Sequence, residues 1–179
     1  MQIENLISAV LQMETEEKYF SFVVKTEFDT KVRYDQSGIV MYLDSDNWLK
    51  ASVEYENDKI QRLGSVVTNN GYSDWASVDI DASVKSMWFR LSRRDDDFCI
   101  ENSTDGKAFK QMRICHMFNV KDRIQFGVYA CTPYIVKPPV LYSAGGQSLS
   151  LFSYFIIFST LQSRIVQRSS ISWVVTPIL

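Results

Sequence analysis

The stretch that decides the fold runs from Tyr34 to Trp75 and reads YDQSGIVMYLDSDNWLKASVEYENDKIQRLGSVVTNNGYSDW. Its middle part, Trp48 to Tyr55, alternates with a period of two residues. One face carries Leu49, Ala51, Val53 and Tyr55, and the other carries Trp48, Lys50, Ser52 and Glu54. Because successive side chains of a β-strand point to opposite faces, this segment is predicted to be a strand with one buried face.

Turn-forming residues divide the stretch into three consecutive antiparallel strands. The nearly continuous apolar run from Gly38 to Leu43 ends at DSDN, Asp44 to Asn47, which favours a turn. ENDK, Glu56 to Lys59, is predicted to be a hairpin turn, and the third strand is expected from about Ile60 to Thr68.

Similar short alternating segments recur along the rest of the chain. They are Tyr19 to Phe28, Trp75 to Ile80, Met87 to Ser92, Phe98 to Asn102, Phe109 to Cys115 and Gln125 to Cys131. About nine short strands separated by turn signals, with no interior helix, are typical of an all-β sandwich or barrel. The expected core consists of Phe22, Val24, Ile39, Met41, Leu49, Ala51, Val53, Phe89, Leu91, Ile100, Phe126 and Val128.

Both ends of the chain differ from this central pattern. Residues 1–18 are predicted to be an extension with a short amphipathic helix, because their apolar residues recur at helical spacing. The sandwich is expected over 19–133, followed by a tail over 134–179 that contains the apolar segment Leu149 to Phe158. This segment is shorter than the ~20 apolar residues that span a bilayer. A closing strand is therefore preferred, and a membrane anchor or a disordered appendage are the alternatives.

Composition and cysteine usage bound the class of protein. A formal net charge of -2, with 46% hydrophobic and 13% aromatic residues, is typical of a folded globular chain and gives no basic surplus for nucleic acid. The three cysteines, Cys99, Cys115 and Cys131, form no CxxC or Cys/His cluster, so reduced thiols are expected rather than a zinc site. The first residues lack the basic region of a secretory signal, which favours a cytoplasmic location.

Four ordered motifs carry a resemblance to a known family. They are DQSG at Asp35 to Gly38, NWLK at Asn47 to Lys50, SDW at Ser73 to Trp75 and SxDG at Ser103 to Gly106. Across roughly Phe20 to Pro133 the chain resembles a family of concanavalin A-like jelly-roll proteins of unknown function, which includes YesU-like bacterial proteins and fungal regulation of enolase proteins. The resemblance implies a lectin/glucanase-type jelly roll of two antiparallel sheets and a link to enolase regulation. The two ends depart from the family pattern.

Aromatic and charged residues on the predicted outward faces form a candidate sugar-binding surface. An indole can stack on the apolar face of a pyranose while charged groups bind its hydroxyls. Trp48 and Trp88 as ordinary core aromatics are the alternative. The candidate site residues are Trp48, Lys50, Glu54, Trp75, Trp88 and Arg90 on one concave surface, with Tyr72 and Asp74 on a loop beside it.

The acidic residues provide weaker signals. Glu54, Glu56 and Asp58 are spaced to share one strand face and would suit a glycosidase, but the hairpin turn would point Glu56 and Asp58 into solvent. DSDN and the GYSDW loop match no calcium motif, so no metal is expected. RRDDD, Arg93 to Asp97, is predicted to be a solvated turn, and no role is assigned to the lone His116.

These features predict a binding or regulatory protein without catalytic activity. Its expected partner is a carbohydrate or a metabolic enzyme, such as a glycolytic enzyme. No cofactor is expected, because the chain has no glycine-rich phosphate loop and no dinucleotide fingerprint. The alternative is a glycoside-active enzyme that uses Glu54 with a second carboxylate, and the oligomeric state stays open.

Overall fold

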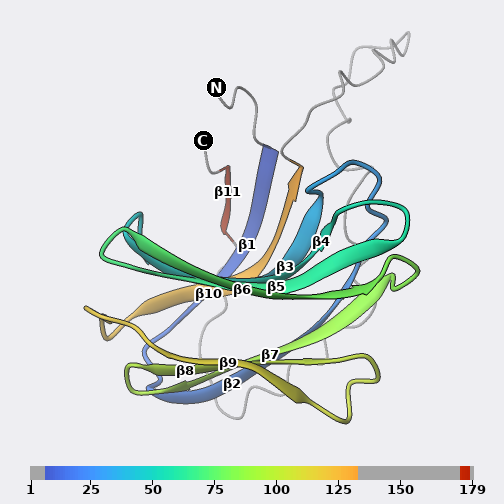
Figure 1. Cartoon of the computed structure of the whole chain (residues 1–179). Coiled ribbons are helices and arrows are strands. Elements are labelled where there is room, and N and C mark those ends of the chain that lie inside the picture. The colour runs from blue at the N-terminus through green and yellow to red at the C-terminus, as the bar shows by residue number, and fades with distance from the viewer. Residues whose placement is uncertain (1–6, 133–173, 178–179) are drawn as a thin grey trace, which may run out of the picture.

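The chain folds into two antiparallel β-sheets stacked face to face (Figure 1). The structure is a computed structural model that describes residues 7–132 and 174–177. The larger sheet has the strand order β11-β1-β10-β3-β4-β5-β6 and the smaller has the order β2-β7-β8-β9. The predicted jelly-roll sandwich is confirmed. The strands are β1 Ile7–Thr15, β2 Tyr19–Glu27, β3 Gln36–Asp44, β4 Asn47–Tyr55, β5 Ile60–Asn69, β6 Tyr72–Asp81, β7 Ser86–Arg94, β8 Asp97–Ser103, β9 Lys110–His116, β10 Ile124–Thr132 and β11 Val174–Pro177.

The core lies between the sheets, and all twelve residues expected there are buried. Phe126 of β10 joins the two layers, since its ring centroid lies 4.9 Å from that of Phe20 and 5.2 Å from that of Phe22, both on β2. Phe89 and Leu91 of β7 are completely buried opposite the larger sheet. The period of two residues therefore identified the inward face of these strands correctly.

The predicted N-terminal helix is wrong for the described residues, because Ile7–Thr15 is strand β1 and pairs with β10 and β11. Met13 joins the main core, whereas Val10 packs with Val40, Tyr129 and Cys131 on the opposite face of the larger sheet. Apolar residues are thus needed on both faces, which removes the alternation that marks a half-buried strand. The segment is part of the sandwich and not an extension outside it.

The C-terminal tail is described only at Val174–Pro177, which pairs with β1 as strand β11. The apolar segment from Leu149 to Phe158, for which a closing strand was expected, lies outside the described residues. Within the described ranges, no helix is long and apolar enough to cross a membrane.

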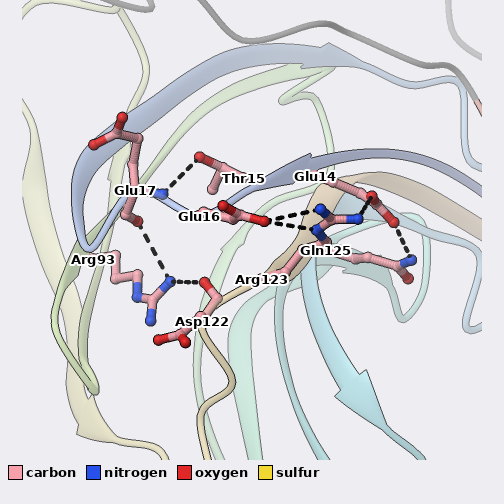
Figure 2. Close-up of polar contacts among 8 residues, drawn as sticks. All are labelled: Glu14, Thr15, Glu16, Glu17, Arg93, Asp122, Arg123 and Gln125. Atoms are coloured by element: carbon pink, nitrogen blue, oxygen red, sulfur yellow. Dashed lines mark hydrogen bonds and ion pairs between the residues drawn. The ribbon is translucent and has the colours of Figure 1, made fainter.

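Arg93 is buried and is not part of a solvated turn, which corrects the prediction for RRDDD. Its side chain is among the largest fully buried ones, at 1% exposure. The Nε group donates to the carbonyl of Asp95 at 2.7 Å, and the terminal nitrogens lie 3.4 Å from the carbonyls of Glu17, Lys121 and Asp122. Figure 2 shows the contacts with Glu17 and Asp122. One guanidinium therefore joins the turn before β2, the turn after β7 and the loop before β10.

β6 forms one edge of the larger sheet (Figure 1). Every residue of this strand except Ile80 is exposed, including Tyr72, Trp75 and Val78. In Figure 1, β1, β10 and β3 curve away from the smaller sheet, so the outer face of the larger sheet, which points away from the core, is curved. This curved face holds the candidate site.

Candidate functional site

A cleft of about 670 Å³ lies on the outer face of the larger sheet, across β3 to β6. Most of the residues that line it are polar, and they include three cationic side chains, two carboxylates and one indole. The residues that define its chemistry are Gln36, Lys50, Glu54, Glu56, Arg62 and Trp75, with Arg33 and Tyr34 also in its wall.

The strand register brings these side chains together. Gln36 of β3, Glu54 of β4 and Arg62 of β5 are direct cross-strand neighbours, so they form one row across the sheet. Lys50 lies four residues before Glu54, which is two periods of the strand, and therefore on the same face. Since cross-strand neighbours are only ~5 Å apart, the row forms a continuous polar floor.

Gly64 gives the cleft its depth beneath Trp75. This glycine is the neighbour of Ser52 on β4 and of Ser77 on β6. A Cβ atom added at Gly64 would lie 3.0 Å from the Nε1 atom of Trp75, closer than most real contacts. The missing side chain therefore lets the indole lie low over β5 while it remains 56% exposed.

Gln36 orders the floor through three hydrogen bonds. Its Oε1 atom accepts from Lys50 Nζ at 2.8 Å and from the Tyr129 hydroxyl at 2.9 Å, while its Nε2 atom donates to Glu54 Oε2 at 3.1 Å. Burial lowers the pKa of Lys50 and raises the pKa of Glu54, and the charge of each residue partly offsets the shift of the other. The Gln36 amide thus lies between the charged groups of Lys50 and Glu54 and fixes both by hydrogen bonds.

Glu56 is a second carboxylate in the cleft, and it is held by two arginines. Arg33 pairs with its Oε1 atom, and Arg62 Nε lies 3.3 Å from its Oε2 atom. The predicted hairpin turn after β4 is present, but the Glu56 side chain is only 12% exposed. The expectation that the turn would point Glu56 into solvent is wrong, because the two guanidinium groups draw it back over the sheet.

The structure brings together three of the eight predicted site residues, namely Lys50, Glu54 and Trp75. Trp48 shares their face of β4 but lies outside the lining of the cleft and is half-buried. Tyr72 is 84% exposed at the start of β6, also outside that lining.

Trp88 and Arg90 do not share the concave surface, contrary to the prediction. Both lie on β7 of the smaller sheet, and their outward face points to the opposite side of the sandwich. Arg90 makes a bidentate contact with Glu101, with one distance of 2.6 Å. A Cβ atom added at Gly106 would lie 2.7 Å from the Trp88 ring, so the β8–β9 hairpin covers this indole.

Asp74 was expected on a loop beside the site, but it lies within β6 and its side chain is on the other face. There it accepts a hydrogen bond of 3.2 Å from Arg113 of β9, which also donates to Ser65 at 3.0 Å. These contacts link the edges of the two sheets. Asp74 therefore has a structural partner away from the cleft.

Sequence reasoning missed Gln36, Arg33, Arg62 and Tyr129. The position of Arg62 could have been predicted, because Arg62, Gly64 and Val66 are spaced two residues apart on a predicted strand and therefore share one face. The position of Gln36 depends on its pairing with Glu54 on β4, and that of Tyr129 depends on the pairing of β10 with β3. The register of β3 and β4 shifts between Tyr42 and Asp44, and β10 is distant in sequence from β3, so neither pairing is readable from one chain.

The described residues offer no group of three or more His, Cys, Asp or Glu side chains that could hold a metal ion. His116 pairs with Asp97 through Nδ1 at 2.8 Å and packs edge-on against Phe118. Both partners of this pair are largely exposed and lie on the smaller sheet, away from the cleft.

Comparisons with known proteins agree with this fold. A family model described as "Protein of unknown function (DUF1349)" matches residues 4–138. The curated protein "Regulation of enolase protein 1" of Saccharomyces cerevisiae is 32% identical over 114 residues, which are 64% of this chain and 56% of that protein. The chain thus spans little more than half the length of this relative.

Two solved structures share the sandwich. A crystal structure of a functionally unknown protein from Saccharomyces cerevisiae has a TM-score of 0.61 at 31% identity, covering 68% of this chain and 64% of that chain. The GH43 protein BlXynB mutant from Bacillus licheniformis has a TM-score of 0.54 at 18% identity, covering 64% of this chain and 24% of that chain. The second likeness concerns the fold alone.

Proposed function

The chain belongs to the DUF1349 family, and on that premise we propose that it is a non-enzymatic binding protein whose cleft accepts a carbohydrate. One observation carries the proposal: an exposed indole stands over a polar, half-buried floor within a single cleft. Trp75 supplies the flat apolar surface, and the row formed by Gln36, Glu54 and Arg62 supplies donors and acceptors. A sugar ring presents one apolar face and several hydroxyls, which is the chemistry that this arrangement complements.

The contacts of the two carboxylates favour binding over catalysis. Glu56 is neutralised by two guanidinium groups, and Glu54 accepts a hydrogen bond from Gln36. A retaining glycosidase needs one carboxylate free to attack the anomeric carbon and a second that delivers a proton. Glu56 would have to leave both arginines before it could act as a nucleophile.

Glycoside hydrolysis is the second candidate, because burial raises the pKa of Glu54 and thereby favours its protonated form. A raised pKa is what a general acid requires near neutral pH. A protein partner is the other alternative: the yeast relative is named for regulation of enolase, so a metabolic enzyme is the partner that this name suggests.

A glycan array combined with a hydrolysis screen separates these candidates. We expect binding of at least one sugar class without turnover, and loss of that binding in Trp75→Ala. Tyr72→Ala is the matched control, because it removes an exposed aromatic of the same strand that does not line the cleft. Turnover that is abolished by Glu54→Gln would replace binding with catalysis. Absence of sugar binding, together with capture of purified enolase, would favour the protein partner.

A further inference from the structure

The cleft has a surplus of positive charge, whereas the whole chain has a net negative charge. Three cations, Arg33, Lys50 and Arg62, line the cleft together with two carboxylates, whereas the chain carries a formal net charge of -2. Asp79 is the β6 neighbour of Arg62, but it is exposed and outside the cleft lining. A local positive surplus on an acidic protein attracts an anionic ligand.

Arg62 is placed to use this surplus. Its Nε atom is bound to Glu56, and the structure shows no other hydrogen bond from this guanidinium to a described residue. An arginine has five N–H donors in a planar fork, so the terminal pair remains available for a carboxylate or phosphate. The guanidinium carbon lies over the Trp75 ring, 5.9 Å from its centre, so the fork is close to the indole.

Lys50 adds a second cation at the floor. It gives one hydrogen bond to Gln36 and has its ammonium 5.5 Å from the centre of the Tyr129 ring. An ammonium group carries three donors, and only one is used in a bond to a described residue. The half-buried ammonium of Lys50 has lost part of its hydration, and a bound anion would stabilise its charge in place of that water.

We infer that the cleft selects a sugar bearing a negative charge, with the ring on Trp75 and its carboxylate or phosphate on the free edge of Arg62. The inference rests on the proposed function and deepens it by naming the ligand class. A uronate and a sugar phosphate provide the same chemistry at this position, because the guanidinium fork matches both groups.

The test measures the affinities of glucose, glucuronate and glucose 6-phosphate for the whole chain by calorimetry. At least one anionic sugar is expected to bind about tenfold tighter than glucose, the effect of one charge-assisted hydrogen bond. Tighter binding of glucuronate would identify a carboxylate as the preferred group, and tighter binding of glucose 6-phosphate would identify a phosphate. Arg62→Gln should abolish the preference, so that this variant binds the anionic sugars no tighter than glucose, and Arg62→Lys, which keeps the charge but loses the fork, should abolish most of it.

Arg123→Gln is the control, because it makes the same charge change at an exposed residue that pairs with Glu14 and Glu16 (Figure 2). Melting temperatures of the variants report whether each is folded. Equal binding of all three sugars, or a preference that survives in Arg62→Gln, would overturn the inference and leave the proposed function standing. Absence of binding by all three sugars, with a silent glycan array, would overturn both.

Discussion

Replacing Arg93 with methionine tests whether a buried guanidinium holds the turns of the sandwich together. The variant keeps an unbranched side chain of similar length but removes every donor to the carbonyls of Asp95, Glu17, Lys121 and Asp122. The bond to Asp95, at 2.7 Å, is charge-assisted and contributes about 1.5–3 kcal/mol.

The other contributions of Arg93 to the free energy of unfolding nearly cancel. The three contacts at 3.4 Å are long for hydrogen bonds, and their loss is partly offset because the variant no longer buries a charge. We therefore expect a loss of about 2 kcal/mol in the free energy of unfolding. For a domain of this size that corresponds to a fall in melting temperature of roughly 4–8 °C.

Urea denaturation and calorimetry measure both quantities. Arg94→Met is the control at the next position, where the side chain is exposed; it loses a bond of 2.7 Å to the Arg93 carbonyl, and because water can replace that donor the loss should stay within about 1 kcal/mol. Arg93→Lys keeps the charge but not the planar fork, and should lose nearly as much as Arg93→Met. A melting temperature for Arg93→Met equal to that of the native chain would refute the reasoning.

Three further predictions concern the cleft and the turns. Because burial raises the pKa of Glu54 above 4.5 in the folded state, its contribution is fully present below that pH and is lost as pH rises through the folded value. Stability measured by urea titration should therefore favour Glu54→Gln over the native chain more strongly at pH 7 than at pH 4. Gly106→Ala should cost about 2 kcal/mol, since φ is +71° and the new Cβ would meet the Trp88 ring, whereas Gly71→Ala, at φ +81° with only an ordinary contact of 3.6 Å to Asp46, should cost about 1; thermal unfolding and near-UV circular dichroism compare the two. Trp48→Ala should lower stability by about 2 kcal/mol, less than for a fully buried indole, and leave sugar affinity unchanged, and an affinity loss in calorimetry would place it in the site.

Sequence alternation identified the fold because most strands bury only one face. Trp48 to Tyr55 coincides with β4 to within one residue, and its aliphatic positions are completely buried. The same rule extended by one step would have identified Arg93, which continues the inward series of Phe89 and Leu91. Arg93 was predicted to be exposed because its side chain is charged, but it is buried and its partners are backbone carbonyls. β1 failed for a different reason, since apolar side chains cover both of its faces.

Only part of the candidate site could be predicted from the sequence, and the reason is geometric. Alternation tells which side chains of one strand share a face, but not which sheet the strand joins. β4 and β7 have equally clear patterns, yet Lys50 and Arg90 point to opposite sides of the molecule. The placement of Tyr129 beside Gln36 is likewise a consequence of the pairing of β10 with β3, which are distant in sequence.

The exposed edge at β6 determines how far the larger sheet can extend. An edge strand presents unpaired N–H and C=O groups that a second chain can extend, and every second residue of the ten in β6, which include Trp75 and Val78, points these groups to the free edge. Its three aspartates, Asp74, Asp79 and Asp81, lie along the same strand. Asp74 is paired with Arg113, but two copies that met edge to edge would bring the four carboxylates of Asp79 and Asp81 into one two-stranded seam, where like charges oppose each other. The strand that carries the stacking indole can thus stay open to solvent without becoming a point of polymer growth, and replacing these aspartates with asparagine would remove that protection.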